Sequence, residues 1–391
     1  MAKELKDLNI AIATHEYFKG TGQELKDFLV ECRVSRVFYV AHLFPFVKDS
    51  ISYLEDYHKG SLEKKLQSPL LPKNDFLLYL RDIFYTFKFF LFDDGKFDFY
   101  IGVDSFNAIL GLVLKKFGKV NTVAFMTIDY VMQKRFKWAL LNWIYVKMDR
   151  IAFYGSDFTW NVSDRMSRQR IVELGEKAKS KVQLIVPIGV PIEEAEKIQV
   201  ERKDNVIVYS GGLLPEYGLE LIVESMPALV KLFPGIELRI IGEGELGQKL
   251  RGMAADLKVS QNTNFVGYIN TNTDRERWLR LLKESTLGLA TYEPSETTYK
   301  RFSDVTKPKD YMSCGLPIIT TSVIPFSEDI QKHNLGRVVE YNVDSFVASI
   351  RELLENKEEL GKIRANVYRF CKDMTWENIF KRVFSEMGVL V

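Results

Sequence analysis

Cysteine, histidine and net charge are all scarce in this chain of 391 residues. The three cysteines, Cys32, Cys314 and Cys371, are odd in number and far apart in the sequence. This pattern excludes a disulfide framework and indicates a reducing compartment. The four histidines show no metal-ligand spacing, so we expect no metal site. A formal net charge of +2 gives no reason to expect nucleic acid as a partner.

Long apolar runs are also missing. No run reaches the length needed to span a membrane, and the first residues lack the apolar core of a secretory signal. We therefore expect a cytoplasmic protein. Aromatic residues are concentrated at residues 76–106 and 136–154.

Alternating strand and helix patterns fill most of the chain. Residues 9–14 read as a buried strand, Gly20 and Gly22 form a turn, residues 23–32 have helical periodicity, and residues 36–40 read as a second strand. This strand–helix–strand order predicts a parallel sheet. The alternation continues to about residue 190, with a strand expected at residues 150–154, and it starts afresh at residue 206.

A chain of this length exceeds one ordinary core, so we predict two domains. The fold class is α/β, with two Rossmann-like, doubly wound parallel-sheet domains. We place the first domain at residues 1–190, a polar linker at 191–204, and the second domain at 205–372. Residues 373–391 are expected to form a final helix.

The most specific segment is Lys-Pro-Lys-Asp-Tyr-Met-Ser-Cys-Gly-Leu-Pro-Ile-Ile-Thr-Thr at residues 307–321. A charged stretch leads into Asp310 and a short helix, which Gly315 and Pro317 end before a β-branched strand. The segment resembles the K-x-x-E-Y-M-A-x-G-x-P-V-I signature of retaining nucleotide-sugar glycosyltransferases with the GT-B fold. These are glycosyltransferase family 4-like proteins, also called glycosyl transferases group 1.

Further segments resemble the same family: residues 209–213 (YSGGL), 238–244 (LRIIGEG), 264–267 (NFVG) and, in the first half, 186–190 (VPIGV). The resemblance implies two domains that face a cleft, a last helix that packs back on the first domain, and a donor site in the second domain. Asp310 would hold the ribose, and glycine loops would admit the diphosphate to backbone N–H groups. The implied donor-binding residues are Gly211, Gly212, Gly242, Gly244, Phe265, Gly267, Arg301, Lys307 and Asp310.

Two cations of the family pattern are absent. The family has G-R-x-x-x-x-K-G after the first strand of its second domain, and here Gly212 and Tyr217 stand in place of the Arg and the Lys. Lys307 occupies the position of the family's own lysine, so we assign it to the donor and to catalysis, with Arg301 second. Asp304 is the nearest candidate for the family's first acid. Lys300 and Lys309 are further possible cations, or part of a solvated basic loop.

Candidates in the first domain follow its strands. Asp129 is a catalytic candidate because it ends a strand where the family approaches the transferred sugar, but it could equally be a helix N-cap. His15 is a second catalytic candidate, with a structural role as the alternative. Gly20, Gly22 and Asp104 are assigned to the acceptor side, and Asp104 could also cap a helix.

We therefore predict a glycosyltransferase (EC 2.4) that moves a sugar from a nucleotide sugar to a glycan, a lipid-linked glycan or another hydroxyl, with retention of configuration. We expect no obligatory metal or cofactor. One alternative is a non-catalytic relative that acts as a binding or partner subunit. Another is a dehydrogenase, because residues 242–247 read G-x-G-x-x-G, but no acid follows at the spacing that NAD requires.

Two aromatic segments leave a further question open. Residues 133–147 mix basic side chains with two tryptophans, and residues 84–92 are rich in phenylalanine. Both could rest on an anionic membrane, which would make the protein peripheral at the inner membrane face. The favoured alternative is a core helix with a cationic outer face.

Overall fold

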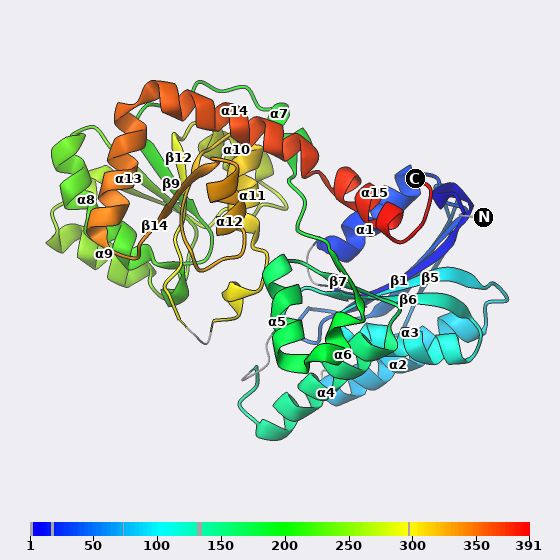
Figure 1. The fold of residues 1–391 in the computed structure, drawn as a ribbon. Coiled ribbons are helices and arrows are strands. Elements are labelled where there is room, and N and C mark those ends of the chain that lie inside the picture. Colours follow the sequence, from blue (N-terminus) through cyan, green and yellow to red (C-terminus); the bar gives the residue numbers. More distant parts are fainter. Residues whose placement is uncertain (1–2, 17–18, 73, 131–134, 296–297) are drawn as a thin grey trace. The chain divides into compact units, whose positions relative to one another are not determined.

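The computed structural model describes residues 3–16, 19–72, 74–130, 135–295 and 298–391. The chain divides into two compact units (Figure 1). The first contains Met1–Pro187 and Trp376–Val391, and the second contains Ile188–Thr375. Each unit is built on a sheet of mainly parallel strands with helices on its faces, which confirms the predicted α/β fold class.

The sheet of the first unit has eight strands in the order β4-β3-β2-β1-β5-β6-β7-β8. Six of them are parallel, and the hairpin of β3 and β4 extends the sheet in antiparallel pairing. The hairpin lies in a stretch to which the sequence analysis assigned no element. The bounds are β1 (Asn9–Glu16), β2 (Arg36–Leu43), β3 (Ser52–His58), β4 (Ser61–Gln67), β5 (Phe97–Val103), β6 (Val120–Thr127), β7 (Phe158–Asn161) and β8 (Val182–Ile185).

Helices cover both faces of this sheet. Figure 1 shows α2, α3 and α4 on one side and α1 with α15 on the other. The end of the chain packs within the first unit, where Phe380 of α15 meets Phe28 of α1 at 5.4 Å between ring centroids. The bounds are α1 (Thr21–Glu31), α2 (Asp75–Leu91), α3 (Ser105–Lys116), α4 (Ala139–Gly155), α5 (Asp164–Leu174), α6 (Glu176–Lys179) and α15 (Trp376–Glu386).

The prediction of a strand at residues 150–154 is wrong, because these residues belong to the C-terminal end of α4. A short apolar run fits a strand and a buried helix segment equally well. Here Asp149, Ala152 and Phe153 are the buried residues of the helix, and their spacing puts them on one helical face. The strand that follows is β7.

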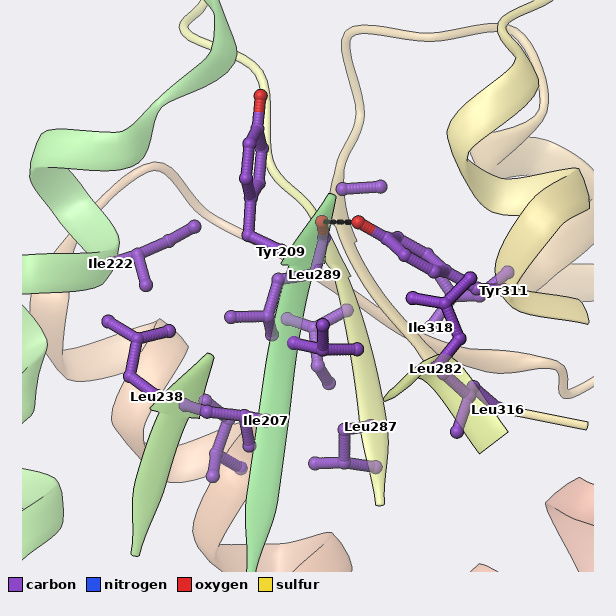
Figure 2. Close-up of a cluster of buried hydrophobic side chains, with 14 of the residues drawn as sticks. Ile207, Tyr209, Ile222, Leu238, Leu282, Leu287, Leu289, Tyr311, Leu316 and Ile318 are labelled. Carbon is purple, nitrogen blue, oxygen red and sulfur yellow. Dashed lines mark hydrogen bonds between the residues drawn. The ribbon is translucent and has the colours of Figure 1, made fainter. Parts of the chain in front are cut away.

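The sheet of the second unit has six parallel strands in the order β11-β10-β9-β12-β13-β14. Its strands are short, and the inner ones are buried on both faces, as is usual in parallel sheets, whereas the edge strands β11 and β14 are partly exposed. Figure 2 shows part of the core, where Ile207, Leu238 and Leu287 pack from neighbouring strands. The bounds are β9 (Val206–Ser210), β10 (Glu237–Ile241), β11 (Thr263–Gly267), β12 (Leu287–Ala290), β13 (Ile318–Thr321) and β14 (Gly336–Val339).

Part of the segment predicted as a linker, residues 191–204, belongs to the folded second unit. Residues 192–196 form the short helix α7 (Ile192–Glu196), and Ile192 and Ala195 are buried in the core of the second unit. Polar residues dominate the segment because only one side of α7 faces the core. The other helices of this unit are α8 (Leu219–Leu232), α9 (Gly247–Asp256), α10 (Arg275–Lys283), α11 (Thr306–Ser313), α12 (Ser327–Lys332), α13 (Val343–Glu355) and α14 (Lys357–Asp373).

Candidate functional site

Three loops meet at the carboxyl edge of the second sheet, after β9, β10 and β11. The Gly211 N–H donates to the Ile241 carbonyl at 2.9 Å, and the Gly242 N–H donates to the Gly267 carbonyl at 2.9 Å. The Leu213 N–H donates to the Glu243 carbonyl at 3.0 Å. Backbone hydrogen bonds therefore hold the predicted glycines of three different strands in one cluster, at the edge where open α/β sheets bind ligands.

Gly211 and Gly242 are required by their conformation and by close approach. Their φ angles are +145° and +139°, a region that side chains with a Cβ rarely adopt. A Cβ on Gly242 would overlap the carbonyl oxygen of Gly211, and a Cβ on Gly211 would overlap the Cε atom of Lys307. The two glycines let the loops touch each other and leave room for that lysine.

Lys307 is on α11, and its ammonium faces aromatic rings within the described residues. Nζ lies 3.3 Å from the ring centroid of Tyr217, 5.3 Å from that of Tyr209 and 5.6 Å from that of Tyr292. Tyr217 is the residue that stands where the family has its second cation. The structure therefore brings a cation from α11 onto the side chain that replaces the missing one.

Burial lowers the pKa of Lys307 to about 7, and nearby Lys300 lowers it further. Aromatic faces attract an ammonium but do not replace its hydration. The side chain is therefore close to losing its proton at neutral pH. Glu216 and Asp310 raise the pKa of Lys307, but less than burial lowers it, so an anion bound at Gly211 would favour the charged form.

Asp310 lies one helical turn beyond Lys307 on α11. Burial raises the pKa of its carboxyl group to about 7, against the opposing effects of Arg275 and Lys307. Arg275, at the start of α10, stacks on the Trp278 ring at 5.3 Å and forms an ion pair with Glu194. Arg275 and Lys307 offset only part of the effect of burial on Asp310, and its half-buried carboxyl group can accept hydrogen bonds from ligand hydroxyl groups.

We expect Asp310→Ala to weaken binding of a nucleoside diphosphate by about 1–3 kcal/mol, the cost of losing a buried hydrogen bond to a charged group. Isothermal titration calorimetry measures the change. Asp256→Ala, at the exposed end of α9, is the matched control and should leave the dissociation constant unchanged. An equal constant for Asp310→Ala and the unmodified protein would remove Asp310 from the site.

The other predicted donor residues surround the same loops. The guanidinium of Arg251 stacks on the Phe265 ring at 4.3 Å, and Gly267 ends β11 with φ +86°. A Cβ on Gly244 would come within 2.5 Å of the Leu213 carbonyl oxygen. The Gly212 carbonyl accepts a 2.6 Å hydrogen bond from the Tyr209 hydroxyl, which Figure 2 shows pointing away from the apolar cluster.

The side chains of Asp304 and Lys309 are buried within the second unit. Asp304 is buried; it accepts a 2.7 Å hydrogen bond from the Ile188 N–H and lies 3.6 Å from the ammonium of Lys309. Burial raises the pKa of Asp304 and lowers that of Lys309, which stacks on Phe326 at 3.5 Å. The structure gives this acid internal partners rather than a place beside the glycine loops.

Arg301 and Lys300 also differ in placement. Arg301 is exposed at the end of a short 3-10 helix, Tyr299–Arg301. Its neighbour Lys300 is buried and donates a 3.3 Å hydrogen bond to the Tyr217 hydroxyl. Lys300, and not Arg301, is therefore the second cation beside Tyr217.

His15, the predicted catalytic histidine of the first unit, is enclosed. Its Nε2 atom lies 3.3 Å from Asp82, its Nδ1 atom lies 3.3 Å from Asp104, and the Asn107 amide is 3.0 Å from Nδ1. Burial alone would lower its pKa, but the two carboxylates outweigh that effect and raise the pKa to about 9. His15 is thus a buried imidazolium that holds two acids together.

Asp104 shows backbone strain. It directly follows β5 with φ +75° and ψ 166°, a conformation that is rare for any residue except glycine. Its carboxylate caps α3 by accepting a 2.9 Å hydrogen bond from the Asn107 N–H, yet the side chain is 44% exposed. The structure confirms that Asp104 caps a helix, and its assignment to the acceptor side stays a prediction.

The remaining first-unit candidates lie at the same sheet edge. Asp129 follows β6 and its carboxylate lies 3.8 Å from Arg135. It does not cap α4, whose N-cap residue is Trp138. Gly20 is the N-cap residue of α1 and Gly22 lies within its first turn, against Thr14 of β1.

The sequence analysis missed Tyr209, Tyr292 and the Trp278–Ser210 pair, in which the indole N–H donates to the serine hydroxyl at 2.8 Å. Tyr209 is the last residue but one of strand β9, and Tyr292 lies two residues beyond β12. Aromatic residues at the carboxyl ends of adjacent parallel strands are the signal that could have found them.

Comparison with known proteins agrees with this architecture. Eight-tenths of the second unit, residues 204–356, matches the model of the family Glycosyl transferases group 1. An uncharacterized glycosyltransferase of Methanocaldococcus jannaschii is 25% identical over 190 residues, which is 47% of this chain and 45% of that protein. The match therefore spans less than half the length of the curated relative. The likeness to the glycosyl transferases group 1 family is therefore carried by residues 204–356, within the second unit.

Solved GT-B structures share the fold of the whole chain. Sucrose-phosphate synthase from Thermosynechococcus elongatus superposes with a TM-score of 0.67 at 13% identity, covering 97% of this chain and 99% of that one. Anabaena HepE, solved in complex with UDP and glucose, gives a TM-score of 0.65 at 12% identity over 98% and 100% of the two chains. At these identities the likeness shows the fold alone.

Proposed function

We propose that this protein is a glycosyltransferase that moves a sugar from a nucleotide-sugar donor to a hydroxyl acceptor, with retention of configuration at the transferred sugar. The observation that carries the proposal is the half-buried Lys307 beside Gly211, at the edge where the loops after β9, β10 and β11 meet. A cation held among aromatic rings, next to glycine backbone that carries no side chain, is suited to an anionic group such as a diphosphate.

The donor would lie along this edge. Its diphosphate would meet Gly211, Gly212 and Lys307, its ribose would bond Asp310, and its base would contact the backbone near Phe265 and Gly267. As the glycosidic bond breaks, negative charge develops on the departing diphosphate. Positioned N–H groups and a lysine stabilise that charge without rearrangement, which lowers the barrier.

The acceptor would approach through the edge of the first sheet that carries Gly20, Gly22, Asp104 and Asp129. Asp129 and Asp104 are the acids there with exposed carboxylates, so they are suited to bond sugar hydroxyls. No metal or cofactor is assigned to the reaction, because Lys307 and the backbone N–H groups supply the electrostatic stabilisation in this scheme.

A panel of nucleotide sugars, incubated with and without candidate glycan acceptors and assayed for nucleotide release, tests the proposal. We expect one donor to release nucleoside diphosphate, faster with acceptor, and the configuration of the product to match that of the donor. If nucleotides raise the melting temperature but no donor is ever consumed, the protein is a non-catalytic relative. Stabilisation by NAD alone would favour the dehydrogenase alternative.

The pH dependence of nucleotide binding follows from Lys307. Its pKa in the free protein is about 7, so above pH 7 the side chain is mostly neutral. A bound diphosphate would raise that pKa, and binding would then take up a proton. We expect affinity for the nucleoside diphosphate to fall as the pH rises from 7.5 to 9, by up to about tenfold per pH unit.

Calorimetry in two buffers of different ionisation enthalpy measures this proton uptake. Lys307→Met, which has no titrating group, should bind more weakly and with an affinity that does not change over the same pH range. A wild-type protein without proton uptake, or a Lys307→Met variant with the same slope, would contradict the assignment.

A further inference from the structure

The first half of α4 has no buried residue. Of the 17 residues of the helix, only Asp149, Ala152 and Phe153 are buried, and all three lie in its second half. Before them, Trp138 is 73% exposed, Leu140 66% and Trp143 63%. The favoured alternative of the sequence analysis, a core helix, is therefore wrong for this segment. An apolar helix that finds no core within its own unit needs another apolar surface.

Helix α2 exposes a second apolar stripe. Phe76, Leu80 and Phe84 recur every four residues along one helical face and are 71%, 46% and 60% exposed, and Phe92 just after the helix is 86% exposed. Both helices contact α3 and lie on the same side of the first sheet (Figure 1). We call these two stripes, Phe76–Phe84 on α2 and Trp138–Trp143 on α4, the aromatic face.

The exposed charges along α4 have one sign, whereas α2 carries the exposed acid Asp75 in its first turn. Between residues 135 and 155 the exposed charged side chains are all basic: Arg135, Lys137, Lys147 and Arg150. The single acid in this range, Asp149, is buried and bonded to Arg170 at 2.6 and 2.9 Å. Tryptophan, leucine and a row of cations together are the composition of helices that lie in an anionic membrane interface.

We propose that the aromatic face binds the surface of an anionic lipid bilayer, with α4 lying in the plane of the interface. The apolar side chains would enter the region below the headgroups, and Lys137, Lys147 and Arg150 would meet lipid phosphates. None of the helices that the structure describes is long and apolar enough to cross a bilayer.

A second copy of the chain fits this face less well. In a symmetric dimer the same patch meets itself, so the basic residues of α4 would be brought together with those of the partner copy. Like charges at close range are repulsive, whereas an anionic surface is complementary. The proposal does not rest on the proposed function, because vesicle binding is measured without nucleotide or acceptor.

Tryptophan fluorescence can test the contact directly. Of the five tryptophans, Trp160 and Trp278 are buried and Trp376 is partly buried, so Trp138 and Trp143 are the two exposed ones. We expect vesicles of phosphatidylcholine and phosphatidylglycerol with brominated acyl chains to quench emission. The Trp138→Phe/Trp143→Phe variant should still bind these vesicles but lose the quenching.

Charge variants test the lipid specificity. Lys137→Glu/Lys147→Glu should lower partitioning into vesicles that contain phosphatidylglycerol at least tenfold, since each cation near such a surface contributes a factor of about five. Lys357→Glu/Lys362→Glu, at two exposed sites on α14, makes the same change in net charge and should have little effect. Because these side chains are exposed, all variants should keep the wild-type melting temperature.

Three results would overturn the proposal. The first is no binding to vesicles that contain phosphatidylglycerol. The second is binding that both charge variants reduce equally, which would show a general effect of net charge. The third is a dimer in sedimentation equilibrium that the Lys137→Glu/Lys147→Glu variant changes while vesicle binding stays intact, which would make a second copy the occupant.

Discussion

Lys307→Met should lower turnover by about 100-fold or more, the size of effect seen when one positioned donor to a developing negative charge is removed. The loss should fall on kcat more than on nucleoside binding, because the charge on the diphosphate grows in the transition state. The variant should fold at least as stably as the wild type, since it removes a half-buried ammonium whose pKa is lowered by burial. Steady-state kinetics and a thermal melt of the same preparation measure both effects.

Two further variants locate the cation. Lys249→Ala, at an exposed site on α9, is the matched control and should keep full turnover. Arg301→Ala should have a smaller effect than Lys307→Met, because Arg301 is exposed whereas Lys307 faces Tyr217. Intact turnover in Lys307→Met together with its loss in Arg301→Ala would move the diphosphate contact to the preceding 3-10 helix. If neither variant changes nucleotide binding and no donor is consumed by any form of the protein, the results would favour the non-catalytic alternative.

Gly242→Ala should abolish nucleotide binding and destabilise the protein by roughly 2–3 kcal/mol, through a strained φ and a steric clash. The added Cβ would overlap the Gly211 carbonyl oxygen, so the loops after β9 and β10 must separate. Separation would break the Gly211 N–H bond to Ile241 and displace the backbone that we assign to the diphosphate. Chemical denaturation and nucleotide titration measure the two losses.

Gly252→Ala is the matched control, because Gly252 lies within α9, the helix that follows the same loop. A Cβ there meets nothing within 4 Å. Alanine in a helix interior is favoured over glycine, so this variant should be stabilised by about 0.5–1 kcal/mol and should bind nucleotide normally. Equal behaviour of the two variants would show that the approach of the loops at Gly242 is not required.

Most elements of the second unit could be predicted from the sequence. Its strands are short and mainly apolar, and glycines follow them, so the hydrophobic pattern and the turn residues predict the same boundaries, as at residues 206–210 and 237–241. The predictions were less accurate where one sequence pattern fits two kinds of secondary structure or carries little signal. Residues 150–154 fit a strand as well as the end of α4, and the polar β3–β4 hairpin carries little hydrophobic signal, since β4 is exposed along its length.

In the candidate site, too, some features could be predicted from the sequence and others could not. The positions of the glycines and of Asp310 could be predicted from the sequence, because glycine is favoured where two backbones touch or φ is positive, and the spacing of the 307–321 segment is specific. The roles of the charged residues could not. Lys300 and Arg301 are adjacent in sequence, yet one bonds Tyr217 and the other is exposed, a difference set by the direction of a single 3-10 turn.

The sequence by itself determined the α/β class, the family resemblance of the second half and the loops built on glycine, because these depend on local conformation and on hydrophobic period. Tertiary structure alone decided which side chains meet. It enclosed Lys307 among Tyr209, Tyr217 and Tyr292, turned Asp304 toward Ile188, and made His15 a buried imidazolium between two carboxylates. It also left the tryptophans of α4 exposed. Burial and partnership join residues distant in sequence, and no local pattern records them.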